Sequence, residues 1–150
     1  EIFPISALAK FNVDTVLSRI RSLLPDSPPY FDKDQWTDRP ARFFVTEIIR
    51  EKILLYYDKE IPYSVEVSVE RYHESEEKIE IDAVIYVERD SQKGIIIGKG
   101  GRALKKVATE ARLSLERFLG KKVFLKTFVK VDKDWRSSDR ELRNFGYNLD

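Results

Sequence analysis

The amino-acid sequence predicts an α+β fold in which helices cover one face of a three-stranded sheet. Two segments alternate apolar and polar residues with a period of two and are separated by a short acidic stretch, a pattern typical of an antiparallel hairpin. A third alternating segment follows only after two helical patterns joined by a glycine loop, and such a crossover returns the chain parallel to the preceding strand. These elements all lie in residues 39–150, which we interpret as one domain.

The first 25 residues predict a short strand, a turn and a helix. Ile2, Phe3 and Ile5 form the expected strand, and Asn12 is the expected N-cap of the helix. The helix then presents one apolar face, made of Val13, Val16, Leu17, Ile20, Leu23 and Leu24. This segment is too small to fold alone, so we expect residues 1–25 to be the end of a larger domain that packs poorly or borrows contacts. Residues 26–38 are rich in proline and polar residues and predict a linker.

The domain over residues 39–150 is expected to begin with a helix. Asp38 is a plausible N-cap with Pro40 in the first turn, and the helix is expected to span residues 39–59. Its apolar residues recur at helical spacing: Val45, Ile48, Ile49, Ile53 and Tyr56.

Two strands follow this helix. Val65, Val67 and Val69 alternate with polar residues, and a second alternating run spans residues 79–87 after an acidic turn at residues 73–77. Ser91 is then expected to cap a short helix that ends at Ile97.

The remaining elements are a glycine loop, a long helix, a strand and a short helix. The long helix is expected to end at Gly120, and alternation over residues 123–131 predicts the third strand. Ser138 and Glu141 have the spacing of a capping box, and the helix that they open is expected to stop at Gly146. The order helix, strand, strand, helix, GXXG loop, helix, strand is that of a type II KH domain, here with an appended C-terminal helix.

The loop Gly98-Lys99-Gly100-Gly101 predicts a clamp for a phosphate backbone. Glycine accepts positive φ and lets a ligand approach the main chain, and the start of a helix attracts anions. A nucleotide-hydrolysing P-loop is excluded, because Gly100 stands where the metal-binding hydroxyl should be; the dinucleotide fingerprint fails at Ala103. The GXXG loop of KH domains, which clamps single-stranded nucleic acid, fits the pattern, with a plain glycine turn as the alternative.

Charge is concentrated around this loop although the whole chain carries a formal net charge of only +1. The segment from Ser91 to Lys126 has ten Lys or Arg and two Glu, which indicates a polyanion site or, alternatively, a solvated helix face. The absence of cysteine and the single histidine exclude disulfides, thiol nucleophiles and a Ser-His-Asp triad. No apolar run reaches the roughly 20 residues that span a bilayer. No catalytic residue and no metal site is predicted.

The sequence resembles the C-terminal half of the Era family of bacterial ribosome-assembly GTPases. The resemblance covers residues 1 to about 147 and depends on several short motifs. They are Thr37-Asp38-Arg39-Pro40, Glu47 to Lys52, Pro62-Tyr63-Ser64-Val65, Ile97 to Gly101, Trp135, and Leu142 to Tyr147.

This resemblance implies a role for each part of the chain. Ser6-Ala7 looks like the remnant of a guanine-contacting motif, so residues 1–25 would be the end of a GTPase domain. The longer parent protein would be a GTPase that binds GTP and Mg²⁺, whereas this chain, without the other nucleotide motifs, would be no enzyme and need no cofactor. The implied partners are the 3′ end of 16S ribosomal RNA and the small ribosomal subunit, whose assembly the family serves. The implied location is cytoplasmic, with peripheral association of the parent with the inner membrane.

We expect the RNA-binding residues to lie in and around the glycine loop. Gly98, Gly100 and Gly101 would let the main chain approach the sugar-phosphate backbone, and Lys99, Arg102 and Lys105 would supply positive charge. Ile96, Ile97 and the strand at residues 79–88 would provide an apolar floor for the bases. Two other hypotheses stay open at this point: a nucleotide- or phosphate-binding enzyme fragment, and a protein-interaction module on the ribosome.

Overall fold

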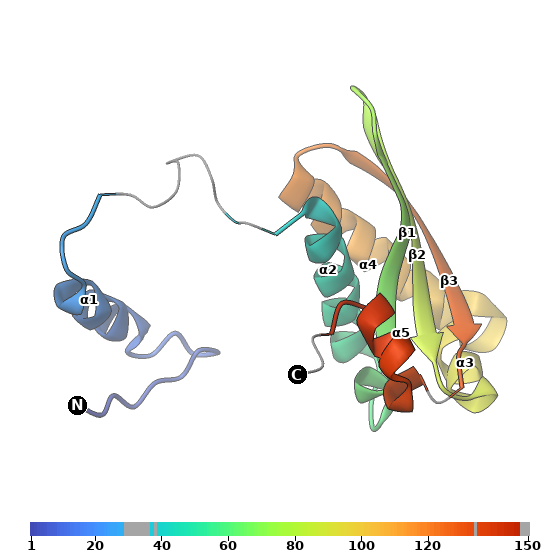
Figure 1. Ribbon diagram of the computed structural model, residues 1–150, viewed down its shortest axis with the longest axis horizontal. Helices are drawn as coiled ribbons and strands as arrows, with labels where there is room; N and C mark the ends of the chain where they lie inside the picture. Colours follow the sequence, from blue (N-terminus) through green and yellow to red (C-terminus); the bar gives the residue numbers. More distant parts are fainter. Residues whose placement is uncertain (29–36, 38, 134, 148–150) are drawn as a thin grey trace. The chain divides into compact units, whose positions relative to one another are not determined.

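A computed structural model describes residues 1–28, 37, 39–133 and 135–147 (Figure 1). The chain divides into two compact units, Glu1–Asp38 and Arg39–Asp150, and each is described here by itself. The predicted N-cap Asp38 and most of the predicted linker lie outside the described residues.

The described part of the N-terminal unit contains one helix, α1 (Val13–Leu23), none of whose residues is buried. The strand predicted at residues 2–5 is wrong: they pair with no other described strand, and a single bridge joins Ser6 to Phe11. Asn12 occupies the N-cap position, but in a left-handed conformation (φ 60°), and its side chain donates to the Pro4 carbonyl instead of capping the helix. The apolar face of α1 remains exposed within this unit, from Leu17 at 43% to Leu23 at 64%.

The second unit is built on a sheet of three strands in the order β1 (Val65–Glu74), β2 (Lys78–Val87) and β3 (Lys122–Val131). β1 pairs with β2 antiparallel and β2 pairs with β3 parallel, which confirms the predicted topology. β2 is therefore the central strand, and β3 is an edge strand. The predicted type II KH order, with its α+β architecture, is confirmed.

Helices cover one face of this sheet (Figure 1). α2 (Ala41–Tyr56) packs on β1, α4 (Arg102–Leu119) packs on β3, and the two helices contact each other. Fully buried side chains such as Ile49, Ile85 and Leu115 fill the space between helices and sheet. Each such aliphatic side chain contributes roughly 1.5–3 kcal/mol by leaving water. α3 (Asp90–Ile97) begins the crossover from β2 to β3 and contacts α4 and β3.

Two predicted helix starts are wrong. α2 begins at Ala41 with Pro40 as its N-cap in an extended conformation, so Pro40 precedes the first turn. α3 is capped at Arg89 and not at Ser91, because the Gln92 side-chain oxygen accepts from the main-chain N–H groups of Glu88 and Arg89 (3.1 and 3.0 Å).

The predicted acidic turn is shorter than expected. β1 continues through Glu74, so His73 is a strand residue opposite Glu80, and only residues 75–77 separate the two strands. A bulge between Val69 and Arg71 shifts the register of this extension.

The C-terminal segment folds onto the face of the sheet that the other helices leave open. α5 (Asp139–Asn144) begins as predicted, with the Ser138 hydroxyl accepting from the Glu141 N–H at 3.3 Å. Just after α5 the ring of Phe145 contacts Tyr86 of β2 and Trp135, with centroids 5.1 and 5.6 Å apart. Among the described residues, no helix is long and apolar enough to cross a membrane.

Candidate nucleic-acid interface

The glycine loop joins α3 to α4 in a conformation that only glycine adopts readily. Gly98, Gly100 and Gly101 have φ values of 68°, 61° and 76°. Gly98 combines its positive φ with ψ 178°, a region that is essentially limited to glycine, whereas Gly100 (ψ 28°) and Gly101 (ψ 6°) are left-handed.

The glycines differ in what surrounds them. A Cβ at Gly98 would lie 2.6 Å from the Cβ of Ala103 in the first turn of α4, so the absence of a side chain lets the two segments touch. A Cβ at Gly100 or Gly101 would meet no heavy atom within 4 Å. Gly98 therefore closes the loop against α4, while Gly100 and Gly101 present main chain to open space.

Three exposed cations surround this main chain. Lys99 lies in the loop, Arg102 begins α4, and Lys105 follows about one turn later; all three side chains are exposed. Within the described residues none of them forms an ion pair, and the first turn of α4 holds no acidic residue. The N-terminal dipole of this 18-residue helix adds positive potential at the same place.

The apolar triplet before the loop is divided between core and surface. Ile96 is fully buried, so its role is core packing and it offers no surface to a ligand. Ile97 is half-buried, and Ile95, which the sequence reasoning missed, is 50% exposed. The pattern of three identical residues carries no signal for which of them faces outward.

The strand predicted to line the groove, residues 79–88, exposes little of its helix-facing side. The helix-facing side chains of β2, such as Ile81, Ala83 and Ile85, are fully buried because β2 is the central strand. α3 contacts β3 as well as β2, and Thr127 and Val129 of β3 remain half-buried. We refer to Ile95, Ile97, the loop and these two β3 residues as the loop-edge surface.

Tyr57, just after α2, holds the end of α3 in place. Its hydroxyl donates to the Ile96 carbonyl at 2.6 Å, a group in the last turn of α3 that has no partner within its own helix. Burial raises the pKa of Tyr57 to about 12. This buried contact fixes the residue two positions before Gly98, and no sequence pattern identified it.

Ser6 and Ala7 lie in the other unit. The Ser6 hydroxyl accepts from the Ala9 N–H at 3.2 Å, and Ala7 is exposed. Across the described residues no group of three His, Cys, Asp or Glu is arranged to hold a metal ion. Ser6 and Ala7 by themselves offer neither a phosphate cradle nor a set of metal ligands, so these two residues alone do not make a site for GTP and Mg²⁺.

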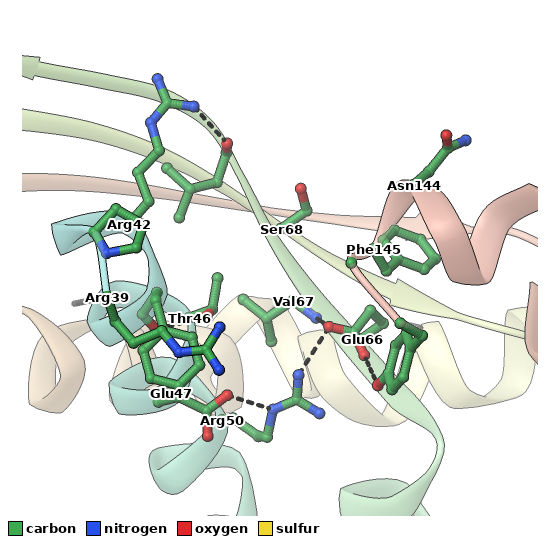
Figure 2. A pocket seen from close by; sticks show the side chains of 15 residues that line it. Arg39, Arg42, Thr46, Glu47, Arg50, Glu66, Val67, Ser68, Asn144 and Phe145 are labelled. Carbon is green, nitrogen blue, oxygen red and sulfur yellow. Dashed lines mark hydrogen bonds and ion pairs between the residues drawn. The ribbon is translucent and has the colours of Figure 1, made fainter. Parts of the chain in front are cut away.

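A hollow of about 570 Å³ lies elsewhere, between the start of α2, β1 and the segment after α5 (Figure 2). Three arginines line it, but none of its residues belongs to the glycine loop. Arg50 is held between Glu47 at 3.3 Å and Glu66 at 2.8 Å. Burial opposes the charge of Arg50, yet the two carboxylates outweigh it and raise its pKa.

Glu66 links this hollow to the C-terminus. Its side chain is only 4% exposed and accepts from Arg50, from the Val67 N–H at 3.1 Å and from the Tyr147 hydroxyl at 2.6 Å. We interpret this cluster as structural, because the carboxylate is fully engaged in fastening the C-terminal segment to β1 and α2.

Comparison with known proteins gives the family. A model of the KH domain matches residues 60–136, just over half of the chain, and this span includes both strands of the hairpin, the glycine loop and β3. The chain belongs to the KH domain family. It is also 50% identical over 148 residues to the GTPase Era of Staphylococcus haemolyticus, covering 98% of this chain and 50% of that protein.

Solved structures give the same result. The chain matches Aquifex aeolicus Era bound to GDP and AlF₄⁻ with a TM-score of 0.91 and 39% sequence identity. The match covers 99% of this chain and 50% of the Aquifex chain. A crystal structure of Era in complex with MgGDPNP and nucleotides 1506–1542 of 16S ribosomal RNA matches with the same TM-score, identity and coverage. The chain thus spans about half the length of the relatives that it matches.

Proposed function

We propose that this chain binds single-stranded RNA through the loop-edge surface. The observation that carries the proposal is the loop itself, where the main chain at Gly100 and Gly101 faces open space beside three exposed cations. A phosphate backbone can approach glycine closely, and Lys99, Arg102 and Lys105 would neutralise it. Ile95 and Ile97 would supply the apolar contact for unstacked bases.

The proposal extends to the longer protein of which such chains are part. The solved Era complex contains a 16S ribosomal RNA segment, which supports the same class of ligand here and a role in small-subunit assembly. Under this proposal residues 1–25 end a GTPase domain, residues 26–38 are a linker, and residues 39–150 bind RNA. GTP hydrolysis with Mg²⁺ would belong to the longer protein and not to this chain. A cytoplasmic location, with peripheral association with the inner membrane, stays a prediction from the resemblance.

Titration separates RNA binding from nucleotide binding. A fluorescently labelled, unstructured single-stranded RNA should bind the chain, and the logarithm of its affinity should fall with the logarithm of salt concentration. Three phosphate contacts at about 0.7 each predict a slope of about −2. GTP has phosphates but is a single nucleotide, so it cannot fill the surface along which an RNA chain would lie. It should therefore bind far more weakly than the RNA. Micromolar binding of GTP together with no binding of RNA would overturn the proposal in favour of a nucleotide site.

A further inference from the structure

The outer face of β3 alternates cations and aromatic rings. We call its five side chains the β3 stripe: Lys122, Phe124, Lys126, Phe128 and Lys130. The residues between them, such as Val123 and Leu125, pack against the core, so the β3 stripe points to the opposite side of the sheet from α4. Phe124 is 54% exposed and Phe128 is 48% exposed.

The position of β3 at the sheet edge explains only part of this pattern. Lysines on an edge strand discourage pairing with another chain. This protective role accounts for the three lysines of the β3 stripe, which recur at every fourth residue. It does not account for two half-exposed phenyl rings between the lysines, because exposed aromatic residues on an edge strand promote association.

Charge around the two rings favours an anion. Among the described residues Lys122 and Lys126 form no ion pair, and these two lysines flank Phe124. The Lys126 ammonium lies 5.5 Å from the centre of the Phe124 ring. The nearest carboxylate in the register, Glu80, is engaged by Lys78 at 2.6 Å and Arg71 at 3.0 Å.

Farther along the β3 stripe, the lysines lie opposite or beside carboxylates. Asp82 is the register partner of Lys126, and Glu70 pairs with Lys130 at 2.7 Å. Lys122 forms no ion pair, but it interacts electrostatically with Glu116, a carboxylate that Arg112 already engages at 2.9 Å. The positive charge least matched by carboxylates therefore lies at the Lys122 end of the β3 stripe, around Phe124.

We propose that the β3 stripe is a second contact for single-stranded nucleic acid, on which bases stack against Phe124 and Phe128 while Lys122 and Lys126 bind phosphates. Side chains on one face of a strand repeat about every 6.6 Å, so a lysine lies between the two rings. Flat rings interleaved with cations are the arrangement by which sheet surfaces bind unpaired strands without sequence preference. The inference takes its ligand class from the proposed function but uses none of the loop residues.

The test compares two double variants and a control by RNA titration. Phe124→Leu with Phe128→Leu keeps apolar side chains on the strand but removes both rings. Phe118→Leu is the matched control, because Phe118 is 53% exposed on α4, away from the β3 stripe. The probe is an unstructured single-stranded RNA of about 16 nucleotides, long enough to reach beyond the roughly four that a GXXG loop clamps.

Loss of both rings should weaken binding of this probe about 100-fold, or about tenfold per stacked base, whereas Phe118→Leu should leave it unchanged. Should the strand variant lose stability, Lys122→Gln with Lys126→Gln tests the same surface without altering packing. With this longer probe, the three loop contacts and the two lysines together predict a slope of about −3.5 for the native chain, since each phosphate contact accounts for about 0.7. The variant should make this slope shallower by about 1.4, to about −2.

The outcomes separate the two proposals. If the unmutated chain binds no RNA, the proposed function itself fails. If the unmutated chain binds and substitutions in the glycine loop abolish binding, while both β3 variants bind with native affinity and native salt slope, the β3 proposal is overturned. In that case the face would serve a protein partner instead.

Discussion

Substitution of Gly98 by alanine should damage the fold far more than the same change at Gly100. Both glycines have positive φ, and the sequence pattern does not distinguish their surroundings. At Gly98 a Cβ would lie 2.6 Å from the Ala103 Cβ and 3.3 Å from the Ala103 nitrogen, and the backbone is in a region that is essentially limited to glycine. At Gly100 the backbone is left-handed and the space is open.

The magnitudes follow from these two environments. Left-handed backbone costs a non-glycine residue about 1–2 kcal/mol, so Gly100→Ala should lower the free energy of unfolding by about 1 kcal/mol. Gly98→Ala has a backbone cost of about 1–3 kcal/mol. Its clash with Ala103 is a case of overpacking and costs a further ~1–3 kcal/mol. We expect a loss of about 4 kcal/mol for Gly98→Ala.

Urea unfolding of the two variants measures this difference, and a third variant tests its cause. Gly98→Ala with Ala103→Gly removes the contact between the two Cβ atoms but not the backbone strain. It should recover about 1 kcal/mol, because about 2 kcal/mol of overpacking is relieved and glycine within a helix costs up to about 1 kcal/mol. Equal losses for Gly98→Ala and Gly100→Ala, or no recovery in the double variant, would refute the reasoning.

Two further predictions concern tyrosine hydroxyls that donate hydrogen bonds. Tyr57→Phe should lower the free energy of unfolding by about 1 kcal/mol at pH 8, because the Ile96 carbonyl loses its donor. The native pKa of Tyr57 is about 12 against an ordinary 10, so its stabilisation is present below pH 10 and is lost as pH rises from 10 to 12. The difference between native chain and variant should therefore shrink by about 1 kcal/mol between pH 8 and pH 11 in urea unfolding; a constant difference would contradict the burial of this hydroxyl. Tyr147→Phe should cost about 1–3 kcal/mol in thermal unfolding, since it removes a 2.6 Å bond to the buried Glu66 carboxylate. Tyr63→Phe, at a side chain 77% exposed, is its control, and equal melting temperatures for the two variants would show that Tyr147 fastens nothing.

The topology could be predicted from sequence because its signals are local. Alternation in residues 65–69 and 79–87 marks the hairpin strands, and the long crossover before residue 123 dictates a parallel return. The ends of the strands are less predictable from sequence, because pairing with the neighbouring strand decides them. His73 is polar and follows an alternating run, yet it stays in β1 because Glu80 lies opposite it.

The candidate site was predictable in its cations and glycines but not in its apolar part. Positive φ at a Gly-Lys-Gly-Gly loop before a helix follows from the chemistry of glycine. The predicted topology already makes β2 the central strand, but the alternating pattern does not show that the helix-facing side chains of β2 are fully buried whereas Thr127 and Val129 of β3 stay half-buried. Likewise only the packing of α3 distinguishes buried Ile96 from exposed Ile95. The bond from Tyr147 to Glu66 joins residues 81 apart and has no local signal at all.

RNA titration of the double variant Lys99→Asp with Gly100→Asp tests the proposed function most directly. Aspartate tolerates the left-handed conformation of Gly100 better than most residues, so the melting curve should stay close to native. Lys10→Asp with Asn12→Asp is the matched control, because it makes the same change in charge at two residues that also have positive φ (52° and 60°), in the N-terminal unit and outside both proposed RNA-binding surfaces. We predict that the loop variant loses RNA binding and that the control variant keeps it. Native RNA affinity in a natively folded loop variant would contradict the claim that this loop binds the phosphate backbone.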